Sequence, residues 1–145
     1  DESDDSGFYD TPRFVTHIDD RAIESLTAFY DDEISAASEA KGGGKVDVLD
    51  LCSSWISHLP TDTDCPLGEV VGVGMNLKEL AANKQLTNYF VQDLNKSPSL
   101  SQFSDSSFDI VCNVVSVDYL TKPQEVFKEM YRVLRPGGVA LISFS

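Results

Sequence analysis

The chain has 145 residues, a hydrophobic content of 41% and a formal net charge of −13, from 24 acidic and 11 basic residues. This length suits one domain with one core, and no apolar run approaches the roughly 20 residues that a membrane-spanning helix needs. An acidic chain is poorly suited to bind the phosphate backbone of nucleic acid, so we expect neither a nucleic-acid partner nor a membrane span. The three cysteines have no metal-ligand spacing, and we expect no metal site.

The acidic residues are concentrated at the N-terminal end of the chain. Residues 1–40 hold 12 of the 24 aspartates and glutamates but only two of the basic residues. We expect residues 1–18 to form an acidic flexible arm and residues 19–145 to form the folded domain. Asp19 suits the cap of a helix that runs to about Ala40. The apolar residues of this helix recur at helical spacing: Ile23, Leu26, Tyr30 and Ile34.

Short apolar runs follow, and they predict buried strands that alternate with helices. The first expected strand starts at Val46, and the five expected strands cover residues 46–50, 69–74, 86–91, 108–115 and 139–144. The expected helices are Ser53–Leu59, one capped by Asn76 that carries Leu77, Leu80 and Ala81, and one from Pro123 with Val126, Phe127, Met130, Val133 and Leu134 inward. Arg135–Gly138 suits a tight turn before the last strand. This alternation predicts an α/β fold with a parallel sheet.

Three motifs of the chain belong together. They are Val48-Leu49-Asp50-Leu51, Phe108-Asp109-Ile110-Val111-Cys112-Asn113, and Leu134-Arg135-Pro136-Gly137-Gly138 before an apolar run. With these motifs, about residues 20–145 resemble the class I S-adenosylmethionine-dependent methyltransferases. The resemblance implies a Rossmann-like, doubly wound sheet of five parallel strands in the order 3-2-1-4-5. That family's sheet continues with strands six and seven, which are absent here, so we expect a fold truncated after strand five.

Three further stretches resemble one subgroup, the methyltransferase-like proteins of plants and algae. These stretches are residues 12–19, 51–55 and 72–76. The likeness suggests a chloroplast protein. Without that likeness, the odd number of cysteines indicates reduced thiols in a reducing compartment. A cytoplasmic location is then the simplest expectation.

The resemblance also implies that S-adenosylmethionine binds at the carboxyl ends of the strands. In the family, the first loop carries glycines at the positions of Cys52, Ser54 and Ile56, because glycine lets the backbone approach the cofactor and adopt positive φ. We expect Asp50 to hold the methionine ammonium, directly or through water. Cys52 and Ser54 would line the cofactor, whereas Ile56 and Trp55 would crowd its cavity.

The second strand departs further from the family's pattern. The family has an Asp or Glu there that accepts from both ribose hydroxyls, and this chain has Gly74. Losing such a charged contact costs about 1.5–3 kcal/mol, so cofactor binding is expected to be weak or lost. Asn76 could replace the acid in part. The other implied contacts are Met75 beside Gly74, Asp93 to the adenine amino group, Leu94 through its backbone, and Asn113 to Val115 on the methionine side.

Two functions from different classes stay open. The first is an enzyme that transfers a methyl group from S-adenosylmethionine to a small molecule, with Asp118 and Tyr119 as the nearest candidates for a base. The second is a catalytically inactive pseudoenzyme that serves as a structural or assembly subunit of a larger complex. A dinucleotide-dependent oxidoreductase is disfavoured, since it also needs a glycine-rich loop and a strand-two acid. A fifth strand at an open edge would need a protein partner or a missing C-terminal segment to cover it.

Overall fold

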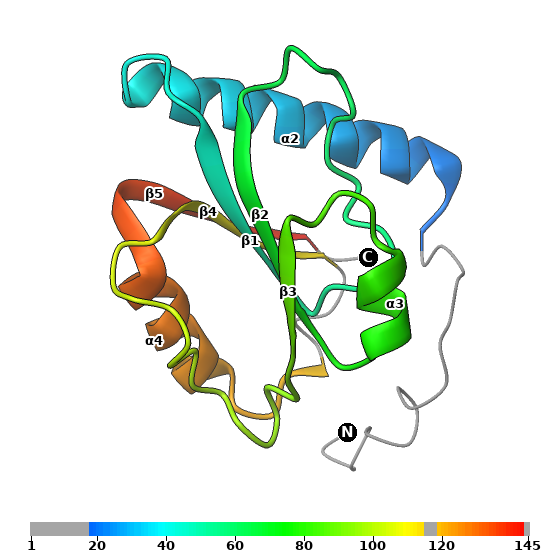
Figure 1. The fold of residues 1–145 in the computed structure, drawn as a ribbon, viewed down its shortest axis with the longest axis vertical. Helices are drawn as coiled ribbons and strands as arrows, with labels where there is room; N and C mark the ends of the chain where they lie inside the picture. Colours follow the sequence, from blue (N-terminus) through cyan, green and yellow to red (C-terminus); the bar gives the residue numbers. More distant parts are fainter. Residues whose placement is uncertain (1–17, 115–118, 144–145) are drawn as a thin grey trace.

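The computed structural model describes residues 18–114 and 119–143, and its centre is a five-stranded parallel sheet (Figure 1). The strands are β1 Val46–Leu51, β2 Leu67–Gly74, β3 Asn88–Val91, β4 Phe108–Val114 and β5 Leu134–Ser143. They lie in the order β3-β2-β1-β4-β5, and every neighbouring pair is parallel. The predicted fold class and strand order are therefore confirmed.

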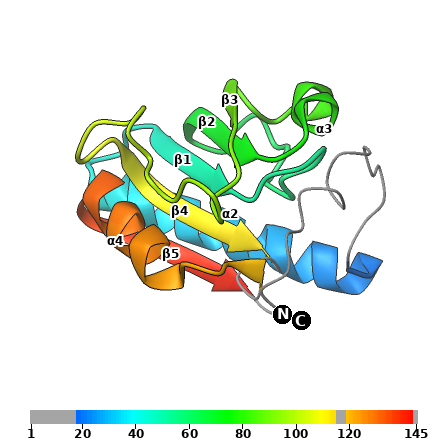
Figure 2. The same cartoon turned by 90° about the horizontal axis from the view of Figure 1, so that it is seen from below.

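Helices cover the two faces of this sheet. The described helices are α2 Asp20–Ala40, α3 Leu77–Ala82 and α4 Pro123–Val133. Helix α2 crosses one face and α4 lies against the opposite face, as the two views in Figures 1 and 2 show. The Asp19 side chain caps α2 by accepting a hydrogen bond of 2.8 Å from the Ala22 amide, as predicted. None of these helices is long and apolar enough to cross a bilayer.

The buried apolar residues form one cluster on each face of the sheet. On the α2 face they are Tyr30, Ile34, Val46, Val48, Leu59, Val70, Ile110 and Cys112. On the α4 face they are Leu49, Leu51, Val71, Val73, Leu94, Leu100, Phe108, Val111, Val126, Met130 and Val133. Alternate residues of β1 thus point to opposite clusters, as expected for a central strand that is buried on both sides.

Some expected inward residues face solvent instead. In α4, Phe127 is 40% exposed, because the buried stripe of this helix is limited to Val126, Met130 and Val133. In α3, Leu77 is 57% exposed and only Leu80 of the predicted set is buried. Both helices lie against the sheet along a narrower stripe than the apolar pattern predicts.

The expected tight turn after α4 is a bulge inside β5. The pairing with β4 jumps from Phe108↔Leu134 to Ile110↔Val139, and Gly137 has a φ of +82°. Such a φ suits glycine, since a side chain would be strained there. The strand therefore begins five residues earlier than the sequence predicts, at Leu134.

An ion-pair cluster joins four elements at the amino ends of the strands. Arg135 contacts Asp47 and Asp109 at 2.9 Å each, and Lys41 contacts Asp109 at 3.0 Å. The Asp47 amide also donates to Asp109. Burial raises the pKa of Asp109, but the hydrogen bonds from the Asp47 amide, Lys41 and Arg135 outweigh it and leave that pKa below its usual value. This cluster stabilises the end of the sheet opposite the candidate site.

Candidate functional site

The parallel sheet brings most of the predicted contacts to one edge. Leu51 at the end of β1 pairs with Val73 of β2 and Asn113 of β4, and Gly74 pairs with Val91 of β3. Carboxyl ends of parallel strands form the ligand-binding edge of open α/β sheets. Asp50, Cys52, Ser54, Gly74, Met75, Asn76, Asp93, Leu94 and Asn113 all lie on or just after these strand ends. Val115 lies outside the described residues.

Asp50 is a buried member of the predicted contacts, with 4% of its surface exposed. Its carboxylate accepts hydrogen bonds from Ser57 at 2.6 Å, from Ser53 at 2.8 Å and from the Cys112 thiol at 3.6 Å. Burial raises the pKa of Asp50 to about 6, although the bonds from Ser57, Ser53 and Cys112 each lower it. The acid expected to bind the methionine ammonium is thus engaged by the chain's own donors.

Cys52 adopts a backbone conformation that favours glycine. Its φ is +56°, in the left-handed region, so the first loop makes a left-handed turn at a residue that is not glycine. Burial, and then the charge of Asp50, raise the pKa of Cys52 to about 12. The thiol is therefore neutral at physiological pH and is not a nucleophile.

Asn113 carries an unsatisfied polar atom beside Cys52. Its Nδ2 lies 3.7 Å from the Cys52 sulfur, and the residue as a whole is 1% exposed. Its Oδ1 is buried without a hydrogen-bond partner among the described residues. A buried acceptor without a donor costs about 1–3 kcal/mol and calls for an explanation, such as a ligand or a water.

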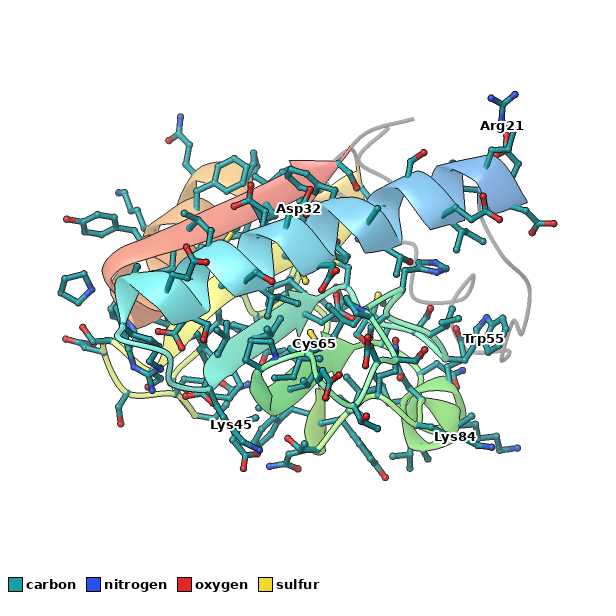
Figure 3. All side chains as sticks on the ribbon, turned by 90° about the horizontal axis from the view of Figure 1, so that it is seen from above. Arg21, Asp32, Lys45, Trp55, Cys65 and Lys84 are labelled. Carbon is teal, nitrogen blue, oxygen red and sulfur yellow. The ribbon has the colours of Figure 1, made fainter. Side chains whose placement is uncertain are left out.

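The segment Ser53–Leu59, which we term the strap, is not the helix that the sequence predicts. It contains neither helix nor strand and runs irregularly away from the end of β1. Figure 3 places its Trp55 at the same end of the molecule as Lys84, which follows α3, while Lys45 before β1 lies at the other end. Trp55 and Ile56 are both partly buried. Without a helix after β1, the strap offers no helix N-terminus to a ligand.

Two residues after α3 hold the strap in this path. Asn83 Nδ2 donates to the Ser54 carbonyl at 3.0 Å and to Ser57 Oγ at 2.9 Å. Gln85 Oε1 accepts from the Ser57 and Leu59 amides at 3.3 and 3.2 Å, and its Nε2 donates to the Leu59 carbonyl at 2.7 Å. These side chains supply partners that a helix would have found within itself.

Gly74 is packed directly under the strap. A Cβ at this position would lie 2.2 Å from the carbonyl oxygen of Ser53 and 3.1 Å from Leu80. The Ser53 amide also donates to Val73 at 2.8 Å, which fixes this residue against β2. No Asp or Glu could therefore occupy position 74 unless the strap moved.

The remaining predicted contacts have defined structural roles. Asn76 is buried and its Oδ1 caps α3 by accepting from the Glu79 amide, so that oxygen is engaged. Asp93 is partly exposed and its Oδ1 accepts from the Asn95 amide. The Leu94 side chain lies in the core, which leaves only its backbone for a ligand. Tyr119 is 52% exposed, and the other proposed base, Asp118, lies outside the described residues.

The site fits S-adenosylmethionine at one end and not at the other. On the methionine side, the unpaired Asn113 oxygen can accept from the cofactor's ammonium, and Cys52 makes the turn. On the ribose side, the Ser53 carbonyl lies against position 74 and takes the space that the side chain of the family's acid would need. The strap anchors Ser57, Asn83 and Gln85 were missed from the sequence. Ser57 follows Asp50 at a short spacing that could have suggested a donor, but no local signal marks residues thirty positions away.

Comparison with known proteins agrees with this fold and this edge. A family described as methyltransferase domain matches residues 49–142, which is most of the chain. The chain therefore belongs to the methyltransferase domain family of S-adenosylmethionine-dependent methyltransferases.

The individual relatives are longer proteins than this chain. It is 36% identical over 81 residues to the demethylmenaquinone methyltransferase of Lactobacillus johnsonii, a match that covers 50% of this chain and 32% of that protein. It is 29% identical over 101 residues to the ubiquinone/menaquinone biosynthesis C-methyltransferase UbiE of Roseobacter denitrificans, which covers 70% and 33%, respectively. The chain thus spans only about a third of the length of these relatives.

A solved structure shares the architecture. The S-adenosylmethionine-dependent methyltransferase from Mesorhizobium loti aligns with a TM-score of 0.57 at 18% identity, over 86% of this chain and 52% of that one. Identity at this level supports the fold alone.

Proposed function

We propose that this domain binds S-adenosylmethionine at the carboxyl edge of its sheet and transfers the methyl group to a small molecule. The observation that carries the proposal is the buried, unpaired oxygen of Asn113 beside the left-handed turn at Cys52. A bound cofactor's ammonium would satisfy this acceptor. The cofactor supplies an activated methyl group on a sulfonium, so the chain's task is mainly to position donor and acceptor.

The acceptor belongs to the proposal as well. Two relatives are named for methylation in quinone biosynthesis, so quinones and their ring precursors are the first class to test. The likeness to plant and algal proteins, and with it a chloroplast location, stays a prediction. So does a protein partner or C-terminal segment along the open edge of β5, which pairs only with β4 among the described strands.

The second candidate is a pseudoenzyme with a structural or assembly role. One observation favours it: the Ser53 carbonyl fills the place from which a ribose-binding acid would project at position 74. Without that acid, the loss of affinity is on the order of one to two powers of ten.

Calorimetric titration with S-adenosylmethionine and S-adenosylhomocysteine tests both candidates. We expect binding in the micromolar to submillimolar range, with a thermal shift of the same protein. If neither heat nor a thermal shift is found up to millimolar ligand, the enzyme proposal fails and the pseudoenzyme is favoured.

A further inference from the structure

We propose that the strap Ser53–Leu59 is an autoinhibitory contact, which closes the ribose end of the site in this structure and opens it when released. The inference rests on the proposed function, since it concerns access of the same cofactor to the same edge. It also explains why a chain with the methyltransferase fold has its own Ser53 backbone in part of the proposed cofactor site.

The closing contact is a backbone contact at the end of β2. The Ser53 carbonyl oxygen would lie 2.2 Å from a Cβ at position 74, and its Oγ would lie 3.1 Å from one at position 72. Glycine at these two positions lets the strap lie flat against the strand. A ligand that needs the space beside Gly74 must therefore displace Ser53.

Upstream of Leu59, the strap is held by hydrogen bonds to side chains of other elements, which could break and re-form. Its anchors are side chains from three separate elements: Asp50 at the end of β1, Asn83 and Gln85 after α3, and Thr27 of α2, whose Oγ1 donates to the His58 carbonyl at 2.9 Å. The net contribution of each such bond is small, since water can replace the partner on opening, and the bonds to the Asp50 carboxylate are the strongest of the set.

Left-handed backbone lies at both ends of the strap. Cys52 has a φ of +56° and His58 has a φ of +57°. Leu59, which is 3% exposed, stays fixed in the apolar cluster of the α2 face. Rotation near these two positions would lift Ser53 and Ser57 while Leu59 remains in the core.

The variant Gln85→Ala tests the inference, because Gln85 bonds the strap backbone and lies outside the proposed cofactor contacts. Gln124→Ala, a change of the same kind on the exposed surface of α4, is the matched control. Two quantities are measured for each protein: hydrogen exchange of the Ser57 and Leu59 amides, and affinity for S-adenosylhomocysteine by calorimetry. Thr27→Val releases the same strap from α2 and serves as a second variant if Gln85→Ala does not fold.

We expect Gln85→Ala to exchange these amides faster and to bind S-adenosylhomocysteine about tenfold more tightly than the wild type, because a larger open fraction lowers the apparent Kd. If exchange quickens while wild type and variant bind equally, the strap does not gate the site, although the proposed function stands. If exchange quickens and neither protein binds up to millimolar ligand, the proposed function and the gate both fail. Unchanged exchange in both released variants would also overturn the inference.

Discussion

The Ser57 hydroxyl donates a hydrogen bond of 2.6 Å to the carboxylate of Asp50, seven residues earlier in the chain. This bond links the carboxyl end of the central strand β1 to the middle of the strap. Ser57 in turn accepts from Asn83, so one buried path of hydrogen bonds connects β1, the strap and the end of α3. The candidate site is built around this path rather than around a glycine-rich loop and a helix.

The charge of Asp50 gives the first prediction. Its pKa is about 6 in the folded protein against an ordinary value of 3.8. Between these values the folded state binds a proton that the unfolded state has released, so this residue favours folding more as the pH falls from about 7 to 4. Asp50→Asn keeps an acceptor for the serines and removes the charge. We expect the variant to be more stable than wild type at pH 8 by on the order of 1–3 kcal/mol, and to lose this advantage near pH 4.

Urea denaturation at pH 4, 6 and 8 measures this difference. Asp64→Asn, the same change on an exposed loop, is the control. An equal stability change for Asp50→Asn at all three pH values would mean that the buried charge is not the cause.

Position 74 gives the second prediction. Gly74→Ala would place a Cβ against the backbone of Ser53, whereas Gly72→Ala would first meet the end of the Leu86 side chain, at 2.6 Å. A flexible side-chain end can shift, but the anchored strap resists. We therefore expect Gly74→Ala to destabilise by about 1–3 kcal/mol, and Gly72→Ala by less. Thermal denaturation of the two variants compares them, and the reverse order would contradict the packing described at Ser53.

The ion-pair cluster gives the third prediction. The side chain of Asp109 is 12% exposed and receives bonds from Lys41, Arg135 and a backbone amide. Asp109→Asn leaves two cations without their shared partner, and we expect a loss of about 1–3 kcal/mol. Its pKa is lowered on folding, so this stabilisation is present above the ordinary pKa of about 4 and disappears as the pH falls through the lower folded value.

A matched change at Asp105 separates this effect from charge in general. Asp105 pairs with Arg132 at 2.8 Å but its side chain is 78% exposed, so Asp105→Asn should change the unfolding free energy by less than about 1 kcal/mol. Denaturant titration at pH 7 gives both values. Equal losses in the two variants would rule out a special contribution from the Asp109 cluster.

Asn113 gives the fourth prediction. Its Oδ1 has no partner among the described residues, so Asn113→Leu removes an unpaired buried acceptor and should leave the free protein at least as stable as the wild type. The same change should weaken binding of S-adenosylhomocysteine by about 10- to 100-fold, because the ligand's ammonium loses an acceptor. Asn88→Ala, at the start of β3, is the control. A variant that binds as tightly as wild type would remove Asn113 from the cofactor site.

The sequence predicts the sheet well because its determinants are local. Apolar runs such as that from Val46, and the cap at Asp19, need no distant partner, and the structure confirms both. The strap is different. Ser53–Leu59 has a helix-compatible pattern, but Asn83 and Gln85 bond its backbone from some thirty residues away and hold it irregular. Tertiary contacts of this kind override local preference and leave no signal in the segment itself.

The same reasoning explains the remaining differences at the site. The family resemblance marks Cys52 as a glycine position, but its left-handed turn follows from the folded path of the loop. The resemblance also marks Gly74 as the place of a missing acid, whereas the carbonyl that lies against Gly74 depends on the strap's path. Local composition thus names the positions of the site, and distant hydrogen bonds decide its shape.

The order of elements along the chain has a consequence for synthesis. Helix α2 precedes β1, yet its Tyr30 and Ile34 pack on β1 and β4, while the connection from β1 to β2 contains only the strap and a loop. During translation, this cover therefore emerges from the ribosome before any strand that it shields. The residues that cover this face are therefore already synthesised when β4 arrives, at the stage when a nascent sheet exposes apolar surface that is prone to aggregation.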